Sequence, residues 1–488
     1  MYIYDRKWSG LQSLVQERPI TSWRVQRKAY YPDRAVDGFL GRGGTNDSFS
    51  PACDSSVATP GFSAAERGKL TPLLSPSQNT QAIRWNRERH PAQSGTRLED
   101  VVIDLGRYVD FAAVRAAIQK SGGSYMISAG TVDAVFVEAV HQFQAKVYFH
   151  ADEQSGALGP STLDSLGIVK HKLKPKIGNV RGRDVVKNIS DKISTLTNNE
   201  FNAKNWFDLI VAPSFLGHRI NRHSQGIHLL LLRKLREAEN SLLSLPAYAG
   251  MTPVALGRAL GLDRKSVYYS GGRLSQENQA MHGVGLALDI DVAGNPWIGA
   301  GWIKDDKEGR DWLIDQIKTN PDAQLKRKYQ GILNKRNERY RFLETLKSAA
   351  GGALNGAAKG TIASFLHAVA VSHGRDTRGA YGILARRNEE FKTFLQNNSS
   401  ELRYWKNSAT FGDRDPLNGF LNLHTNLVFA LRQTALLAWG AIDFGSSASG
   451  DVMHFDLRTL GAGRVIAEKL GAYVPRSGHH PVNGETKV

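Results

Sequence analysis

Apolar residues along this 488-residue chain recur with a helical period in some stretches and a strand period in others. Between Val101 and Leu166 the helical period dominates. Phe111, Val114 and Ile118 stand at positions i, i+3 and i+7, which places all three on one helix face. This part of the sequence therefore predicts a set of short amphipathic helices.

Two distant stretches follow a period of two instead. In the first, Leu286, Leu288, Ile290 and Val292 alternate with Ala287, Asp289 and Asp291. In the second, Met453, Phe455 and Leu457 alternate with Val452, His454 and Asp456. Successive strand residues point to opposite faces, so each stretch predicts a strand with an apolar face and a polar one.

The polar faces of the two predicted strands carry residues that bind metals. His282 precedes the first strand, and Gly283 and Gly285 allow a turn that returns its imidazole over Asp289. The second strand supplies His454. Two histidines and one aspartate suit zinc and leave a fourth position for water, so we expect a Zn²⁺ site. Asp291 and Asp456 share the polar faces, and we expect them to orient the histidines or to be solvated.

The long segment between Asp289 and His454 is rich in helical patterns from about residue 303 to 404. Helices are predicted over residues 312–317, 323–347, 361–371 and 381–395. We interpret the segment as a helical insertion over one rim of the cleft that is expected to hold the Zn²⁺ ion. We favour a structural role as a buttress over a role in restricting the substrate or binding an inhibitory partner. Tyr340, Tyr381 and Trp405 are candidates for stacking on sugar rings, although aromatic residues at such spacing are more often core.

Composition sets the outer limits of the predicted domains. Residues 1–98 are rich in Ser, Pro, Gly and Arg, which predicts a mostly disordered N-terminal region. Residues 169–199 form a basic linker, expected either to stay solvated or to attach to an anionic wall or nucleic acid. The domain that contains the predicted Zn²⁺ site is assigned to residues 200–475 and a polar tail to residues 476–488.

The charge balance and the single cysteine limit which surfaces the protein can bind and which covalent or metal cross-links it can contain. The chain has 63 Lys and Arg against 46 Asp and Glu, a formal net charge of +17 that favours contact with a polyanionic surface. Cys53 is alone, which excludes an internal disulfide and a multi-cysteine zinc cluster. The N-terminus lacks the apolar core of a signal peptide, and no uncharged apolar run reaches membrane-spanning length.

The metal-binding pattern is similar to that of a known enzyme family. His282-x-x-Gly285-x-Ala287-x-Asp289, followed much later by Asp451-x-x-His454, resembles the zinc D-Ala-D-Ala carboxypeptidases and L-alanyl-D-glutamate endopeptidases, with their hedgehog-type fold. The resemblance implies that His282, Asp289 and His454 are zinc ligands and that Asp451 is the general base. It implies a substrate-orienting arginine upstream, for which Arg273 is the candidate. Ala280 stands where the family usually has serine.

A second resemblance lies in the predicted helical module at residues 101–168. Ala139-Val140-x-x-Phe143-Gln144 and the later Gly156-x-x-Gly159-x-x-Thr162 are similar to the signature of three-helix peptidoglycan-binding modules. The Asp-Gly turn usual before the middle helix is replaced by Gly130-Thr131-Val132-Asp133. The alternative is an unrelated small helical hairpin with a glycine turn.

Together these features predict an α+β protein: a small antiparallel-sheet zinc peptidase domain with a large helical insertion, preceded by a three-helix module. The expected activity is cleavage of the peptidoglycan stem peptide, at the L-Ala–D-Glu bond or at one involving D-Ala. The expected role is that of a phage endolysin or of a toxin effector delivered to the bacterial wall or periplasm, with a secretion or contractile-injection component or an immunity protein as partner. A catalytically inactive wall-binding protein is the alternative. Nucleic-acid binding is supported by charge alone, without a motif.

Overall fold

The computed structural model describes residues 54–89, 98–127, 132–169, 171, 180–220, 226–263, 281–298, 307–334, 337, 362–407, 411 and 414–481. The chain divides into two compact units. Unit 1 comprises Met1–Asp54 and Gly61–Leu173, and unit 2 comprises Ser55–Pro60 and Lys174–Val488. Helices predominate and the sheets are small and antiparallel, which confirms the predicted mixed α+β class. Over the described parts of the chain, no helix is both long enough and apolar enough to span a membrane.

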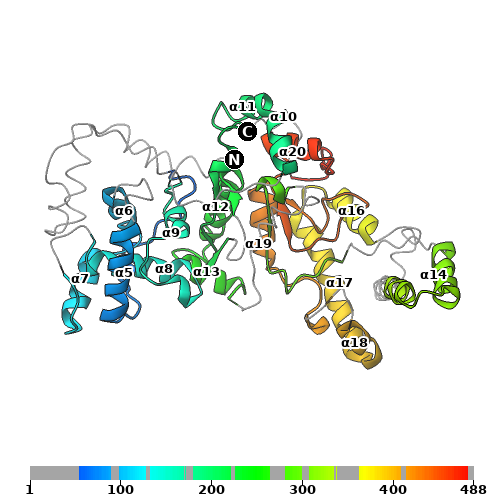
Figure 1. Ribbon diagram of the computed structural model, residues 1–488, viewed down its shortest axis with the longest axis horizontal. Helices are drawn as coiled ribbons and strands as arrows, with labels where there is room; N and C mark the ends of the chain where they lie inside the picture. Colours follow the sequence, from blue (N-terminus) through cyan, green and yellow to red (C-terminus); the bar gives the residue numbers. More distant parts are fainter. Residues whose placement is uncertain are drawn as a thin grey trace. The chain divides into compact units, whose positions relative to one another are not determined.

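Unit 1 is a helical module built around α8, which is buried along almost its whole length (Figure 1). α5, α6 and α7 pack against α8. The side chain of Asp133 caps α8 by accepting a hydrogen bond from the amide of Phe136, 2.9 Å away. The helices of unit 1 are α4 (Ala64–Gly68), α5 (Pro76–Arg89), α6 (Leu98–Leu105), α7 (Phe111–Lys120), α8 (Ala134–Val147), η1 (Ala151–Glu153) and α9 (Pro160–Ser165).

The two segments of unit 1 that were singled out by their resemblance, around Gln144 and Gly156, contact each other. Phe143 is fully buried, and the adjacent Gln144 reaches across to the glycine turn. The Gln144 side chain accepts a hydrogen bond from the Gly156 amide at 2.8 Å and donates to Thr162 Oγ1 at 3.0 Å. Gly156 has φ +74°, and a Cβ there would lie 2.8 Å from Val137 Cγ1, so glycine is required. The residues of the two segments are therefore explained by the contacts that hold α8 against the glycine turn.

Residues 54–89 differ from the predicted disordered N-terminal region, because they include α4 and α5. Leu74 and Ile83 lie in the unit 1 core. Polar side chains also hold this segment in place: Glu138 accepts a hydrogen bond from the Leu74 amide, and Asn86 bonds the backbone of the Gly156 turn. Few apolar residues suffice here because buried polar partners on α8 anchor the chain, which composition alone does not reveal.

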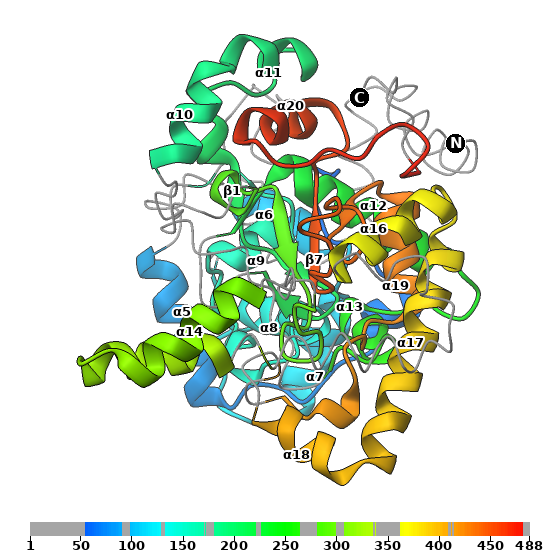
Figure 2. The same cartoon turned by 90° about the vertical axis from the view of Figure 1, so that its right-hand side faces the viewer.

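Unit 2 is organised around a three-stranded antiparallel sheet in the order β5-β7-β6 (Figure 2). In its register Asp289 lies opposite His454, and both Ala287 and Ala438 lie opposite Asp456. Two further two-stranded sheets pair β1 with β4 and β2 with β3. The strands are β1 (Ile210–Val211), β2 (Ser214–Phe215), β3 (His218–Arg219), β4 (Ile227–His228), β5 (Ala287–Asp289), β6 (Ala438–Trp439) and β7 (His454–Asp456).

Unit 2 also contains many helices. They include the predicted helix that begins at Pro253, whose N-cap Thr252 accepts a hydrogen bond from the Ala255 amide at 3.3 Å. The helices in the described part of unit 2 include α10 (Val180–Asn188), α11 (Ser190–Leu196), η2 (Trp206–Leu209), α12 (Leu229–Leu243), α13 (Pro253–Ala259), η3 (His282–Val284), α14 (Lys307–Thr319), α16 (Ile362–His373), α17 (Thr377–Asn397), α18 (Ser399–Lys406), η5 (Pro416–Asn418), α19 (Thr425–Phe429), the π-helical turn η6 (Ala430–Thr434) and α20 (Gly461–Leu470).

Two segments of unit 2 differ from their sequence-based interpretation. The predicted basic linker contains α10 and α11, which pack against α20, and Arg181 donates a hydrogen bond to the Leu470 carbonyl at 3.3 Å. Among the candidates for sugar stacking, Trp405 is fully buried against Phe391 and Phe411. Tyr340 lies outside the described residues.

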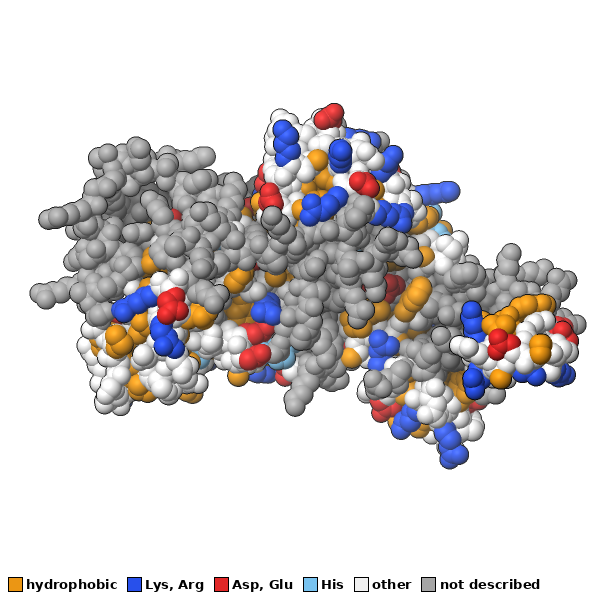
Figure 3. Space-filling model, in the orientation of Figure 1, with side chains coloured by type: hydrophobic (Ala, Val, Ile, Leu, Met, Phe, Trp, Pro, Cys, Tyr) orange, Lys and Arg blue, Asp and Glu red, His pale blue; other side chains and the backbone are white. Residues whose placement is uncertain are grey.

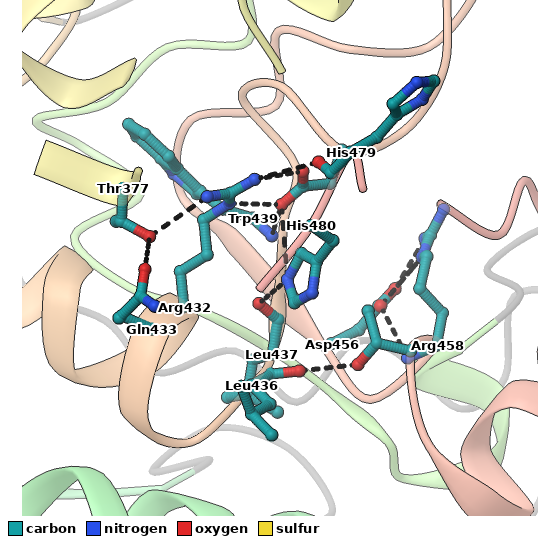
Figure 4. A network of polar contacts seen from close by, with 12 residues as sticks. Thr377, Arg432, Gln433, Leu436, Leu437, Trp439, Asp456, Arg458, His479 and His480 are labelled. Carbon is teal, nitrogen blue, oxygen red and sulfur yellow. Dashed lines mark hydrogen bonds and ion pairs between the residues drawn. The ribbon is translucent and has the colours of Figure 1, made fainter. Parts of the chain in front are cut away.

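A buried ion pair ties the helices of the insertion to the sheet (Figure 4). Arg432 on η6 donates to both carboxylate oxygens of Asp443, at 2.8 and 2.9 Å. Arg432 also bonds Thr377 Oγ1 on α17 and the carbonyl of Gly374. Asp443 in turn accepts from the amide of Trp439 on β6 at 2.9 Å. The insertion therefore supports the strand next to β7.

The chain beyond α20 closes the same network, in contrast to the predicted polar tail. His480 is 1% exposed, and its Nε2 lies 3.0 Å from the Leu437 carbonyl and 3.8 Å from Asp443 Oδ2. Burial lowers the pKa of His480 to about 4, although Asp443 opposes the shift. His480 is thus held neutral inside the fold.

We expect His480 to make the stability of unit 2 depend on pH. An unfolded histidine titrates near pH 6.5, whereas folded His480 titrates near pH 4. Between these values the unfolded state binds more protons, so the free energy of unfolding should fall as the pH drops from about 6.5 to about 4, by about 3 kcal/mol. Denaturant unfolding of wild type and His480→Gln across this range measures the effect, which should shrink in the variant. His373→Gln, at a partly exposed histidine of the same unit, should keep the wild-type pH dependence; an identical pH dependence in all three proteins would contradict the assignment.

Candidate metal centre

Three side chains from η3, β5 and β7 converge on one point in unit 2. Asp289 Oδ1 lies 3.5 Å from His282 Nε2 and 3.0 Å from His454 Nδ1, and the two imidazole nitrogens are 3.2 Å apart. Both histidines are buried. Within the described residues, these three form the group of histidine and acidic side chains that could hold a metal ion.

The turn that carries His282 is the one that its glycines predict. η3 ends at Val284, and its C-cap is Gly285, which has φ +78°. A Cβ there would lie 2.6 Å from Ile210 Cδ1 and 2.9 Å from the amide nitrogen of His228, so only glycine fits. Trp206 Nε1 donates to the Val284 carbonyl at 3.0 Å, and the His228 amide donates to the Gly285 carbonyl at 2.7 Å. The turn is therefore fixed from outside before any metal binds.

The strands that carry Asp289 and His454 are shorter than the stretches of alternating apolar and polar residues that predicted them. β5 ends at Asp289 because the chain turns at Asp291, which has φ +49°. Asp291 does not orient a histidine. Its carboxylate accepts hydrogen bonds from the Gly294 amide and from the Asn422 side chain, both at 3.1 Å.

Asp456 has the orienting role expected from the sequence. Its Oδ2 lies 3.2 Å from His454 Nε2, and Arg458 donates to the same carboxylate through Nε at 2.8 and 2.9 Å. An Nε2–H donated to Asp456 leaves the Nδ1 lone pair of His454 facing Asp289 and His282, as a metal ligand requires. Phe444 packs its ring edge-on against His454 and lies under the Arg458 guanidinium. Neither Arg458 nor Phe444 was predicted from the sequence. Arg458 could have been, because it follows Asp456 by two residues and so falls on the same face of the predicted strand.

The charges at the centre are balanced by a positive charge shared among the three side chains. Burial disfavours a charged His454, yet Asp289 and Asp456 outweigh it and raise the pKa of His454 to about 10. Burial likewise opposes ionisation of Asp289, but His282 and His454 hold the pKa of that carboxyl well below its usual range. In the absence of metal, a proton on the imidazole balances the carboxylate; a divalent cation would replace it.

The spacing of the ligand atoms fits zinc. Tetrahedral Zn²⁺ with bonds of about 2.0–2.1 Å places neighbouring ligand atoms about 3.3 Å apart. The three distances here, 3.0, 3.2 and 3.5 Å, bracket that value. The residues present therefore fit a zinc ion with three protein ligands.

Asp451 lies beside this group without belonging to it. Its Oδ2 is 3.8 Å from His454 Nδ1, and 23% of its side chain is exposed. A turn rather than a strand joins the two, with the His454 amide donating to the Asp451 carbonyl at 3.2 Å. Gly440 is required opposite, since a Cβ there would lie 2.5 Å from the Asp451 carbonyl oxygen. Burial raises the pKa of Asp451 to about 6, against the opposing effect of His454 and with a further contribution from Asp289.

The other histidines singled out by the sequence have different roles. His424 caps α19, accepting a hydrogen bond from the Asn426 amide at 3.1 Å. Neither His424 nor the His479–His480 pair joins a group of potential metal ligands among the described residues. Arg273 and Ala280 lie outside the described residues.

Comparison with known proteins adds no relative. No family model, no curated protein and no solved structure matches this chain.

The three-ligand geometry predicts that His282→Ala and His454→Ala each lose bound zinc. Each substitution leaves only two protein ligands, so zinc should dissociate on dialysis, whereas wild type should retain one equivalent. Elemental analysis after dialysis measures the stoichiometry. His424→Ala is the matched control and should bind zinc like wild type. Full zinc retention by both ligand variants would refute the assignment.

Proposed function

We propose that this chain is a zinc-dependent peptidase that cleaves the stem peptide of peptidoglycan. The observation that carries the proposal is the separation of roles among four neighbouring side chains. Three of them, His282, Asp289 and His454, converge as ligands. The fourth, Asp451, is partly exposed beside them, 3.8 Å from His454 Nδ1. A metal-binding group with one adjacent carboxylate outside it is the arrangement that hydrolysis of an amide by activated water requires.

The chemistry divides between the metal and the residues of the chain. A bound zinc ion supplies Lewis-acid polarisation of the scissile carbonyl and lowers the pKa of a water molecule. Asp451 accepts the proton of the attacking water and then donates it to the leaving amine, so one side chain acts first as base and then as acid. Asp456 keeps the His454 ring in the orientation that points Nδ1 at the centre.

Sequence features of both units support the wall as substrate. The joint pattern around His282 and Asp451 resembles peptidases of the stem peptide, and the Gln144–Gly156 contact in unit 1 closes a module that resembles peptidoglycan-binding domains. The formal net charge of +17 suits an anionic envelope. The bond cleaved is L-Ala–D-Glu or one involving D-Ala.

The division of roles predicts different outcomes for two Asp→Asn substitutions. Asp451→Asn keeps the shape but removes the basicity, so it should retain zinc and lose turnover by roughly 10²–10⁴-fold. Asp289→Asn replaces an anionic ligand and should weaken zinc binding itself. Mass spectrometry of muropeptides released from purified sacculi identifies the bond and measures turnover, while elemental analysis measures zinc.

Three results would count against this proposal. Zinc loss in Asp451→Asn together with full activity in Asp289→Asn would reverse the two roles. Full activity in both variants would rule out the mechanism. Stoichiometric zinc in wild type without release of muropeptides would instead identify an inactive wall-binding protein.

Unit 1 should contribute attachment to the wall rather than catalysis. Deleting residues 61–173 should weaken binding to insoluble sacculi and leave hydrolysis of small soluble muropeptides nearly unchanged, because all four proposed active-site residues belong to unit 2. Co-sedimentation with sacculi and a soluble-substrate assay separate the two effects. Equal sedimentation of the truncated and complete proteins would remove the attachment role.

A further inference from the structure

Trp297 is an exposed aromatic residue next to the proposed general base. Its side chain is 46% exposed, whereas the neighbouring Ile298 is buried. Trp297 forms an isolated antiparallel bridge with Asp451, and the Ile298 amide donates to the Gly450 carbonyl at 3.0 Å. The indole is therefore placed by backbone pairing with the segment that carries Asp451.

The bridge determines the face on which the indole lies. Directly opposed residues in an antiparallel pair project their side chains to the same side, with Cβ atoms about 4.5–5.5 Å apart. The Asp451 side chain projects toward His454. The Trp297 side chain accordingly starts from the same face of the pair as the Asp451 side chain.

The turn that leads to Trp297 is held in a single conformation. Asn295 Nδ2 donates to the Asp291 carbonyl at 2.9 Å, and Asn295 Oδ1 accepts from the Asn422 amide at 2.8 Å. Asn295 is fully buried. An exposed indole on a fixed turn loses little conformational entropy when a ligand covers it, which favours a binding role.

The character of the ligand follows from the surface and from the substrate. The indole offers a broad apolar face, which suits a neutral group with a flat apolar surface of similar size. Stem peptides consist of alanine residues, an acidic residue and a diamino acid, none of which has a broad neutral face. The sugar rings of peptidoglycan have such a face, and the ring nearest to the stem is the N-acetylmuramic acid to which the stem is attached.

We propose that Trp297 binds the N-acetylmuramic acid ring of the substrate, so that the enzyme acts on stem peptides still attached to the sugar. This inference rests on the proposed function. At the L-Ala–D-Glu bond, one alanine and the lactyl group separate the scissile carbonyl from the ring, about two residue lengths or ~7 Å. A ring stacked on a residue adjacent to Asp451 is within that reach. The D-Ala bonds lie farther along the stem, so this placement selects the L-Ala–D-Glu bond.

Binding to an inactive variant tests this role independently of catalysis. In an Asp451→Asn background, calorimetry would compare N-acetylmuramoyl-L-Ala-γ-D-Glu-diaminopimelate with the same tripeptide lacking the sugar. The sugar should raise affinity by about tenfold, a gain typical of one well-packed aromatic contact. Adding Trp297→Ala should abolish the gain, and Trp297→Phe should restore part of it.

Trp312 on α14 provides the matched control. Its side chain is 51% exposed, and hydrophobic side chains gather over this helix in the space-filling view (Figure 3). Trp312→Ala should leave the sugar-dependent gain intact. Zinc stoichiometry and circular dichroism should be unchanged in every Trp variant.

The outcomes separate this inference from the proposed function. A sugar-dependent gain that survives Trp297→Ala, or equal losses for both ligands, would overturn the sugar contact. Absence of the gain in the Asp451→Asn parent would overturn it as well. Failure of the wild-type protein to cleave the sugar-linked peptide would instead overturn the peptidase proposal, because the binding comparison requires no turnover.

Discussion

The pairing of β5 with β7 is the constraint on which the rest of the centre depends. These strands are three residues long, yet their register places Asp289 opposite His454. A shift by one residue would turn one ligand to the other face of the sheet. Three residue pairs are too few to fix the register, so contacts around the sheet must fix it. Gly440 allows close approach of the Asp451 carbonyl, and the Gly285 turn packs against the His228 backbone.

Buried charges reinforce this short sheet from both ends. Arg458 and Asp456 hold His454 on β7, while Arg432 and Asp443 hold β6 against the helices of the insertion. Each pair has further hydrogen-bond partners, as a buried ion pair needs if attraction is to offset the loss of hydration. Replacing one member would leave its partner charged and buried, so the networks specify geometry more than they add stability. Most of unit 2 thus supports a sheet that by itself could not keep three ligands within 3.5 Å.

The sequence predicts the ligands better than it predicts their supports. The alternation of apolar and polar residues and the two glycines after His282 are local signals. They correctly predicted the turn at His282 and the strands that place Asp289 opposite His454. The role of Asp291 could not be predicted from the alternation, because β5 ends two residues earlier, at Asp289, and Asp291 has a positive φ. Order in residues 54–89 and burial of His480 depend on partners far along the chain. Trp297 was not singled out from the sequence because its closeness to Asp451 depends on a long-range bridge between the two residues.

The position of the insertion explains how so long a segment can interrupt a metal centre. The segments that flank it meet at one contact, where the Asn422 amide donates to Asn295 Oδ1 at 2.8 Å. Asn422 also reaches Asp291, two residues after the ligand Asp289. Closing a long loop costs only slightly more than closing a short one, because the entropy grows with the logarithm of length. Once this contact closes the loop, the segment between can lengthen without moving Asp289 or Trp297. The same closure places α16 and α17 where Thr377 and Gly374 contact Arg432, so the insertion stabilises the sheet that it interrupts.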